Sequence, residues 1–467
     1  MENATTIRSE IEKELKLGGY TFNSFGQATG LNRGIFSAML NGNPPKPISV
    51  RQMDLITKAF NYPEGWLYDL YVDECFYDGR PHWKRVKPFL IRCVEVGNLR
   101  CVEKVLSRLM EDLNHIPTIF ALAEELYEGG KLQEAIPFYE CVIENEKYQH
   151  SERLAISHYK LFVASVGQDL EKNLESVLRF IPYRNRLPES YQLDGLLKII
   201  NIYFYLHKWD SVKKYGDELC TLAKTVYLNR YENNNTKRRV KDEFKTEKNL
   251  VFYYGYGYLS KSTALQKMEK FEEAQSYIKY YADLSWFKGL NSEGEQYVKM
   301  FSLWAKANSY TLDMLLGKRD VLVEYISFLN QHPEEKLSGL LTILESANKY
   351  NFSVDYVLEI FSAEIDQFKF LDDVKNRNYY CCFLYQRAIY EYRSNSLEKG
   401  TNYVLDCLAL SLISRNDSDF KQCVALFEVY REFATYEQTK RYENIIKEVN
   451  IYEKRLFSGT SLRYSIF

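Results

Sequence analysis

The chain of 467 residues has little proline and glycine, 11 and 22 residues, and no marked excess of either charge. Few helix-breaking residues, together with 46% hydrophobic and 27% charged side chains, exclude a disordered chain and favour a helix-rich fold. The formal net charge of -2 excludes a histone-like polycation, so any contact with nucleic acid must be local. Because a typical domain has about 150 residues, we expect two or three structural units.

Long hydrophobic runs are also lacking. No apolar stretch approaches the roughly 20 residues that a membrane-spanning helix needs. The first residues, Met1 to Thr6, have neither the basic nor the apolar region of a secretion signal. We therefore expect a cytoplasmic protein with no membrane partner.

Motifs that carry catalysis or hold cofactors are missing as well. The sequence contains no phosphate-binding or dinucleotide-binding glycine pattern, no zinc-protease motif and no hydrolase serine motif. The nine cysteines form no C-x-x-C pair, and the six histidines are far apart. Buried reduced thiols explain the neighbouring Cys381 and Cys382 better than redox chemistry does. We expect no enzymatic activity, no metal and no cofactor.

Residues 1–72 are expected to form five short helices separated by sharp turns. Turn and capping residues place them at Ile7 to Lys16, Phe22 to Thr29, after Asn32 to Leu40, after Ser49 to Ala59, and from Pro63 to about Tyr71. Gly30 makes the turn between the second and third helices.

This segment resembles the helix-turn-helix domain of Cro and phage repressors. The match rests on Phe25, Gly30, Leu31, Phe36 and Leu40, with Phe22 and Gly26 as departures from the usual pattern. The resemblance implies that the third helix enters the major groove of double-stranded DNA. It assigns base or phosphate contacts to Thr21, Asn23, Asn32, Arg33, Gly34, Ser37 and Ala38.

Two features leave an alternative open for this segment. Basic and acidic residues are equal in number over 1–72, which also fits a bundle that docks onto protein. The stretch 80–108 is rich in Lys and Arg, and either reaches DNA phosphates or forms a solvated helix face.

From about residue 90 the sequence becomes a series of amphipathic helices with an internal repeat. Residues 122–139 follow the tetratricopeptide pattern, with small residues for close helix packing and glycine at the turn. A second and a third unit align Leu174 and Val212 with Ala135, and a fourth centres on Ala274 after a polar insertion, 229–249. A fifth unit is recognised in Ala388 to Tyr392 followed by Leu397 to Gly400. Residues 297–373 read as helical without a clear repeat register, and final helices are expected at 419–433 and 436–457.

The predicted fold is therefore all-α, with an N-terminal helix-turn-helix domain followed by a right-handed tetratricopeptide-like α-solenoid. We place the domain at 1–72, a linker at 73–89 and the repeats at 90–467. Such a solenoid has a concave face that binds peptides. Candidates to line it are Tyr159, Asn201, Tyr205, Tyr385 and Tyr392, with packing between helices as the alternative.

This combination resembles the peptide-sensing regulators of Gram-positive bacteria, the group that includes the Rap proteins and the phage arbitrium receptors. The resemblance implies a homodimeric transcriptional regulator of the quorum-sensing type, whose DNA binding changes when a short signalling peptide occupies the concave face. The alternative is an adaptor that binds response regulators or other proteins without touching DNA. Short peptide, double-stranded DNA and a second copy of the chain are the expected partners.

Overall fold

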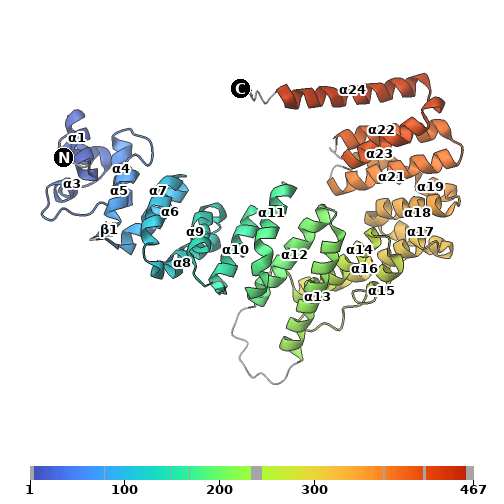
Figure 1. Ribbon diagram of the computed structural model, residues 1–467, viewed down its shortest axis with the longest axis horizontal. Helices are drawn as coiled ribbons and strands as arrows, with labels where there is room; N and C mark the ends of the chain where they lie inside the picture. Colours follow the sequence, from blue (N-terminus) through green and yellow to red (C-terminus); the bar gives the residue numbers. More distant parts are fainter. Residues whose placement is uncertain are drawn as a thin grey trace, which may run out of the picture. The chain divides into compact units, whose positions relative to one another are not determined.

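The computed structural model describes residues 5–77, 79–148, 150–167, 169–232, 244–371, 374–413 and 417–458. Over these residues the protein is 78% helix, with 24 α-helices and one small hairpin, which confirms the all-α prediction (Figure 1). The chain divides into two compact units, Met1–Leu206 and His207–Phe467.

The first unit begins with five helices whose starts are set by side-chain caps. They are α1 (Ile7–Leu17), α2 (Phe22–Thr29), α3 (Arg33–Leu40), α4 (Val50–Ala59) and α5 (Tyr68–Glu74). Thr6, Thr21, Asn32 and Ser49 each accept a hydrogen bond from a backbone N–H of the following turn. The first four helices lie where the sequence predicted them.

The predicted start of the fifth helix is wrong. The helix begins at Tyr68 and not at Pro63, because Gly65 has a φ of +84° and the chain turns before it can continue as a helix. Aromatic packing holds these first helices together: the Phe25 ring contacts the rings of Phe36 and Phe60 at centroid distances of 5.2 and 4.5 Å.

The segment predicted as a linker, 73–89, is structured. It contains the end of α5, the hairpin of β1 (Phe76–Tyr77) and β2 (Arg80–Pro81), and the first half of α6 (Trp83–Glu95). Phe89 is fully buried against the rings of Tyr68 and Tyr71, 5.3 and 4.9 Å away. The first five helices therefore share one hydrophobic core with the helices that follow.

The rest of the first unit is a row of helices, each packed on its neighbours. It consists of α7 (Leu99–Leu109), η1 (Leu113–His115), α8 (Ile116–Glu128), α9 (Leu132–Asn145), α10 (Glu152–Ser165), α11 (Leu170–Phe180), η2 (Ile181–Arg186) and α12 (Glu189–Tyr205). Ala135 is fully buried where α8 and α9 pack together, as a small residue at a close helix contact should be.

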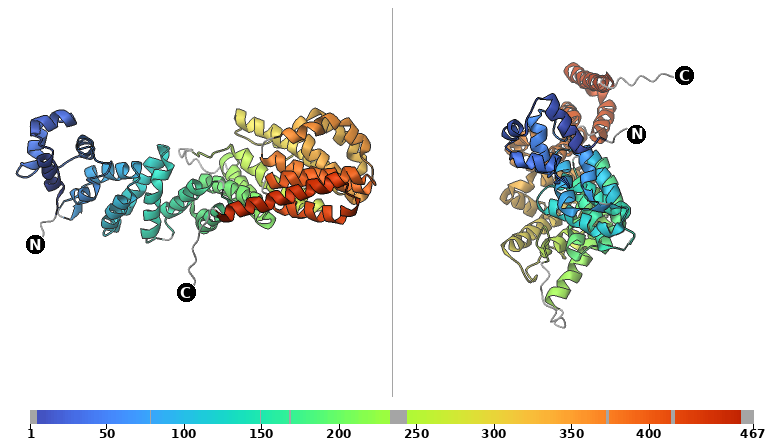
Figure 2. Two further views of the ribbon diagram at one scale, coloured as in Figure 1. Left: turned by 90° about the horizontal axis from the view of Figure 1, so that it is seen from above. Right: turned by 90° about the vertical axis from the view of Figure 1, so that its left-hand side faces the viewer.

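The second unit continues in helices throughout (Figure 2). In order they are α13 (Trp209–Tyr231), α14 (Leu250–Lys267), α15 (Phe271–Ile278), α16 (Ser292–Leu315), η3 (Arg319–Val321), α17 (Leu322–Gln331), η4 (Pro333–Glu335), α18 (Lys336–Tyr350), α19 (Asp355–Ile360), α20 (Ser362–Gln367), η5 (Phe368–Phe370), α21 (Val374–Arg393), α22 (Leu397–Ile413), α23 (Asp417–Val429), η6 (Arg431–Phe433) and α24 (Tyr436–Ser458).

Two of the sequence predictions fall in this unit. The region 297–371 is helical and the last two helices form as expected, with α24 packed on α22. The predicted insertion 229–249 includes residues 233–243, which lie outside the described part of the chain, and α13 extends into it as far as Tyr231.

Two glycines set the closest approach of helices in the second unit. Gly216 on α13 faces Gly257 on α14, and a Cβ added to Gly257 would lie 2.7 Å from both the Gly216 carbonyl oxygen and the Cys220 backbone nitrogen. The two helices pack closely along each other because glycine has no side chain to hold their backbones apart.

Candidate functional site

The turn between α2 and α3 is built by local contacts. Gly30 adopts a φ of +70°, which ends α2 in the left-handed conformation. The Thr29 hydroxyl donates to the Phe25 carbonyl at 2.8 Å and accepts from the Leu31 N–H at 3.2 Å. A Cβ on Gly26 would meet the Leu31 carbonyl at 2.8 Å, so this glycine, a departure from the usual pattern, is required by how tightly α3 follows α2.

The residues predicted to contact DNA lie on this turn and on α3. Six of them, Thr21, Asn23, Asn32, Arg33, Gly34 and Ser37, are exposed, and Ala38 is half-buried. Two serve as helix caps as well: the Thr21 hydroxyl accepts from the Ser24 N–H at 3.1 Å, and the Asn32 side-chain oxygen from the Gly34 N–H at 2.8 Å.

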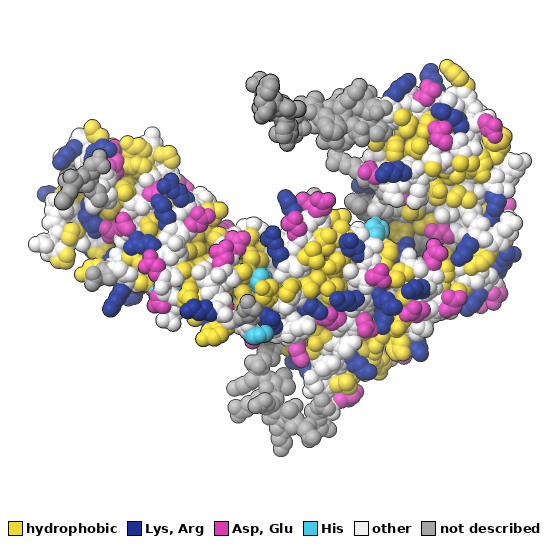
Figure 3. Space-filling model, in the orientation of Figure 1, with side chains coloured by type: hydrophobic (Ala, Val, Ile, Leu, Met, Phe, Trp, Pro, Cys, Tyr) yellow, Lys and Arg dark blue, Asp and Glu magenta, His cyan; other side chains and the backbone are white. Residues whose placement is uncertain are grey.

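Arg33 is the exposed cation of this group. It stands at the first residue of α3, and among the described residues it forms no ion pair. Its guanidinium is therefore free for an outside acceptor. Basic and acidic side chains are otherwise interspersed over the described surface that Figure 3 shows.

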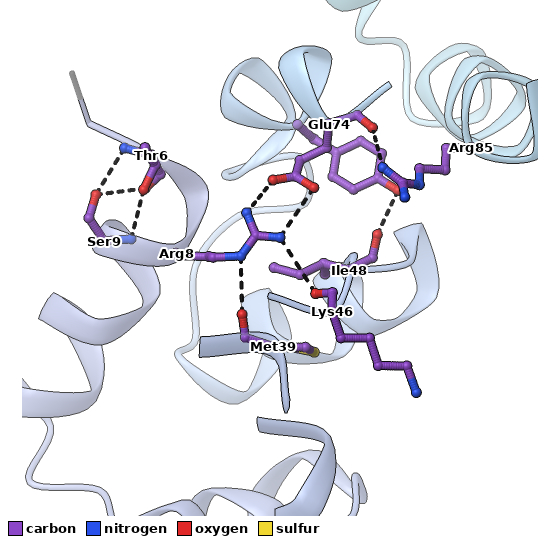
Figure 4. Close-up of polar contacts among 9 residues, drawn as sticks. Thr6, Arg8, Ser9, Met39, Lys46, Ile48, Glu74 and Arg85 are labelled. Carbon is purple, nitrogen blue, oxygen red and sulfur yellow. Dashed lines mark hydrogen bonds and ion pairs between the residues drawn. The ribbon is translucent and has the colours of Figure 1, made fainter. Parts of the chain in front are cut away.

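A half-buried arginine that the sequence did not single out fixes the far end of α3 (Figure 4). Arg8 on α1 donates to the Met39 carbonyl at 3.1 Å and to the Lys46 carbonyl at 3.5 Å, and its guanidinium pairs with the Glu74 carboxylate on α5. Arg85 on α6 donates to the Glu74 carbonyl at 3.0 Å. The end of α3 is thus tied to α1, α5 and α6 through one chain of contacts.

The basic stretch 80–108 is largely committed to contacts within the protein. Arg92 pairs with Asp54 at 3.0 Å, Lys104 with Asp69 at 2.5 Å, and Arg108 with Asp73 at 2.8 Å. Lys87 pairs with Glu125 on α8. The first three pairs hold α4 and α5 against α6 and α7. With Lys87, they engage four of the eight basic residues of the stretch, so less positive charge is available for DNA phosphates than the sequence alone suggests.

Of the five residues proposed to line a peptide surface, two are buried. Tyr159 is 3% exposed and packs on Phe180 and Tyr191, and Tyr392 is 6% exposed and bonds to the Thr401 hydroxyl at 3.1 Å. For both, the prediction is wrong and the alternative of packing between helices holds, because a ring in a helix-helix contact fills space that water would otherwise occupy.

The other three are accessible to different degrees. Tyr205 at the end of α12 is 67% exposed, while Asn201 on the same helix is half-buried. Tyr385 on α21 is half-buried beside a small cavity of about 110 Å³ in the second unit. The five residues divide between the two units, three in the first and two in the second.

An aromatic cluster around Lys160 was missed because its members come from four helices. The Lys160 ammonium lies 3.5 Å from the Tyr127 ring centre and 4.9 Å from that of Tyr191. Burial lowers the pKa of Lys160, while the Glu124 and Glu128 carboxylates act in the opposite direction. Glu124 in turn accepts from the Tyr139 hydroxyl.

The neighbouring cysteines differ in exposure. Cys381 is buried, with its sulfur 3.2 Å from that of Cys407, but Cys382 is exposed, so the prediction of two buried thiols is wrong for Cys382. Successive residues on a helix point about 100° apart, which places the two side chains on different faces of α21. In the described part of the chain no three metal-binding side chains gather, and no helix is long and apolar enough to cross a membrane.

Comparison with known proteins found no matching family model and no matching curated protein.

Proposed function

We propose that the protein is a DNA-binding transcriptional regulator whose repeat region responds to a short signalling peptide. In this proposal residues 1–72 form a Cro-type helix-turn-helix domain and the later helices a right-handed tetratricopeptide-like solenoid. The observation that carries it is the α2–turn–α3 unit: an αL glycine at the turn, a buried Phe36 that fixes α3, and an exposed, unpaired Arg33 at the start of α3.

The short recognition helix favours a dimer for this function. A recognition helix of eight residues reads too few base pairs alone, and two half-sites one helical turn apart supply the missing affinity. The peptide would shift the population between arrangements that can and cannot bind both half-sites. Tyr205 and Asn201 on α12 remain the accessible peptide-contact candidates of the first unit.

Selection of bound duplexes from a random DNA pool at about 100 mM salt tests the proposal. The intact chain should enrich a two-fold-symmetric motif, and Arg33→Ala should lose about 1 to 3 kcal/mol of discrimination at one position of each half-site. Lys13→Ala is the matched control, since Lys13 is an exposed cation on α1. A folded dimer that enriches no motif would contradict DNA recognition.

The second candidate function, a protein-binding adaptor, is favoured by the intrachain pairing of the basic stretch. Lys87, Arg92, Lys104 and Arg108, half of the eight basic residues in 80–108, pair with carboxylates of the same chain, which reduces the positive charge that the stretch offers to DNA. Stoichiometric capture of a response regulator through residues 1–72, with no retention on DNA at low salt, would establish the adaptor instead.

A further inference from the structure

A groove of about 730 Å³ runs between α4 and α6 in the first unit, and no residue of α3 lines it. This volume lies within the range of ligand-binding pockets in proteins, about 300 to 1,000 Å³. Its apolar lining comes from both helices, with Val50 and Leu55 on α4 and Pro88 and Ile91 on α6. Pro88 and Ile91 are three residues apart and so lie on one face of α6. On α4, Val50 is the first residue of the helix, and Leu55 lies among the charged residues of the lining.

Each of the three acidic side chains that line the groove has an ion-pair partner. Asp54 accepts from Arg92 at 3.0 Å and from the Tyr68 hydroxyl at 2.8 Å. Glu64 also pairs with Arg92, and Glu95 pairs with Lys131 at 2.7 Å. Arg92 and Lys131 together balance two of these three carboxylates, so one negative charge of the lining is not balanced by them.

Two basic side chains of the same lining have no such partner. Arg51 and Lys58 are exposed on α4 and form no ion pair among the described residues. They are seven residues apart, which is two helical turns or about 10.5 Å along α4. Thr57, between them, has a buried hydroxyl without a hydrogen-bond partner. The groove is thus an apolar channel with two free positive charges along one wall.

We propose that this groove docks an acidic amphipathic helix of a partner protein. The apolar stripe of such a helix would fill the channel between α4 and α6, and two carboxylates about two turns apart would pair with Arg51 and Lys58. The same two cations disfavour a basic helix, so charge selects among amphipathic partners. The inference is independent of DNA recognition, because it uses no residue of α3.

Fluorescence anisotropy with synthetic helices tests the docking on the full chain. The probe is a labelled 18-residue peptide with leucines at positions i, i+3, i+4 and i+7 and two glutamates seven residues apart; its counterpart carries lysines in their place. We expect the acidic peptide to bind about tenfold more tightly, since two partly exposed ion pairs contribute about 0.5 to 1 kcal/mol each. The double variant Arg51→Glu/Lys58→Glu should reverse this preference.

Lys84→Glu is the matched control, because Lys84 is exposed on α6 but does not line the groove. Both peptides should bind to this variant with the same affinity as to the natural chain. Ile91→Asp should weaken the binding of both peptides, because it places a charge in the apolar lining of the groove. Circular dichroism checks that each variant is folded. Failure of both peptides to bind, or the same peptide preference in the charge-reversed variant, would overturn the proposal.

Two further results would also overturn it, by giving the groove another occupant. If the double variant loses DNA affinity at low salt while the peptides do not bind, the cations serve phosphates. If it changes the mass of the protein in solution while the peptides do not bind, the groove faces a second copy of the chain. Neither result depends on whether Arg33 reads a DNA sequence. The groove proposal can therefore fail while the regulator proposal holds, and the reverse is also possible.

Discussion

His158 on α10 is held in its neutral form by its surroundings. Its ring stacks on Tyr183 with 3.7 Å between the centroids, its Nε2 is buried without a partner, and burial lowers its pKa to about 4. The unfolded chain keeps a pKa near 6.5 and so binds more protons between pH 6.5 and 4. This contribution to stability is complete above pH 6.5 and is lost as the pH falls toward 4, by about 2 kcal/mol at pH 5.

Urea unfolding at pH 7 and pH 5 measures that loss. His158→Phe keeps an aromatic ring against Tyr183 but cannot take up a proton, so its stability should fall by about 2 kcal/mol less than that of the natural chain. His82→Phe, at an exposed position, is the comparison. Equal losses in the natural chain and in His158→Phe would contradict the assignment.

The sequence predicted single residues well where their role is local. Asn32 and Ser49 cap helices because each bonds to the backbone within its own first turn. Arg8 and Glu74, in contrast, are 66 residues apart, and no local pattern relates them. The same reason explains why the free charges of Arg51 and Lys58 could not be distinguished from the paired ones of the basic stretch.

At the scale of helices, the crossing of α13 and α14 makes a sharp prediction. Gly257→Ala would place a methyl group 2.7 Å from the Cys220 backbone nitrogen, which no side-chain movement relieves. The helices must move apart, at a cost of about 1 to 3 kcal/mol in the free energy of unfolding. Gly167→Ala is the control, since an added Cβ there meets nothing within 4 Å.

Denaturant midpoints of the two variants give this comparison directly. A Gly257→Ala chain as stable as Gly167→Ala would show that the contact between α13 and α14 is looser than described.

The sequence predicted the helix positions from periodicity and caps. The start of α5 was predicted too early because Pro63 is typical of the first turn of a helix. The positive φ of Gly65, which delays the helix to Tyr68, cannot be seen in the sequence.

At the scale of the molecule, two compact units imply that unfolding is not a single transition. Each unit has its own buried residues, and helices packed mainly on their neighbours unfold with limited cooperativity. Scanning calorimetry should show a van't Hoff enthalpy smaller than the calorimetric one. Lowering the pH from 7 to 5 should move the transition of the first unit through His158, and His158→Phe should reduce that shift.

One sharp transition, shifted as a whole by His158→Phe, would contradict the division into units. The sequence placed the domain boundaries at 72 and 90, where short helices with sharp turns give way to longer amphipathic helices. The contacts instead divide the chain after Leu206. The spacing of turns and caps shows where helices are short or long, but it does not show which helices pack together. The burial of Phe89 against Tyr68 and Tyr71 joins the two regions in one core.

The Tyr62 ring stacks on Trp66 with 4.3 Å between the ring centroids, so the fluorescence of Trp66 depends on the state of the groove. Tyr62 lines the groove, and Trp66 is the indole it contacts, while the other four tryptophans, Trp83, Trp209, Trp286 and Trp304, stand elsewhere in the chain. Anything that enters the space beside Tyr62 changes the surroundings of Trp66, and with them its emission. Trp66 is therefore an intrinsic fluorescent probe of the groove. Once the other four tryptophans are replaced by phenylalanine, tryptophan emission would report whether the groove is occupied, without an added label.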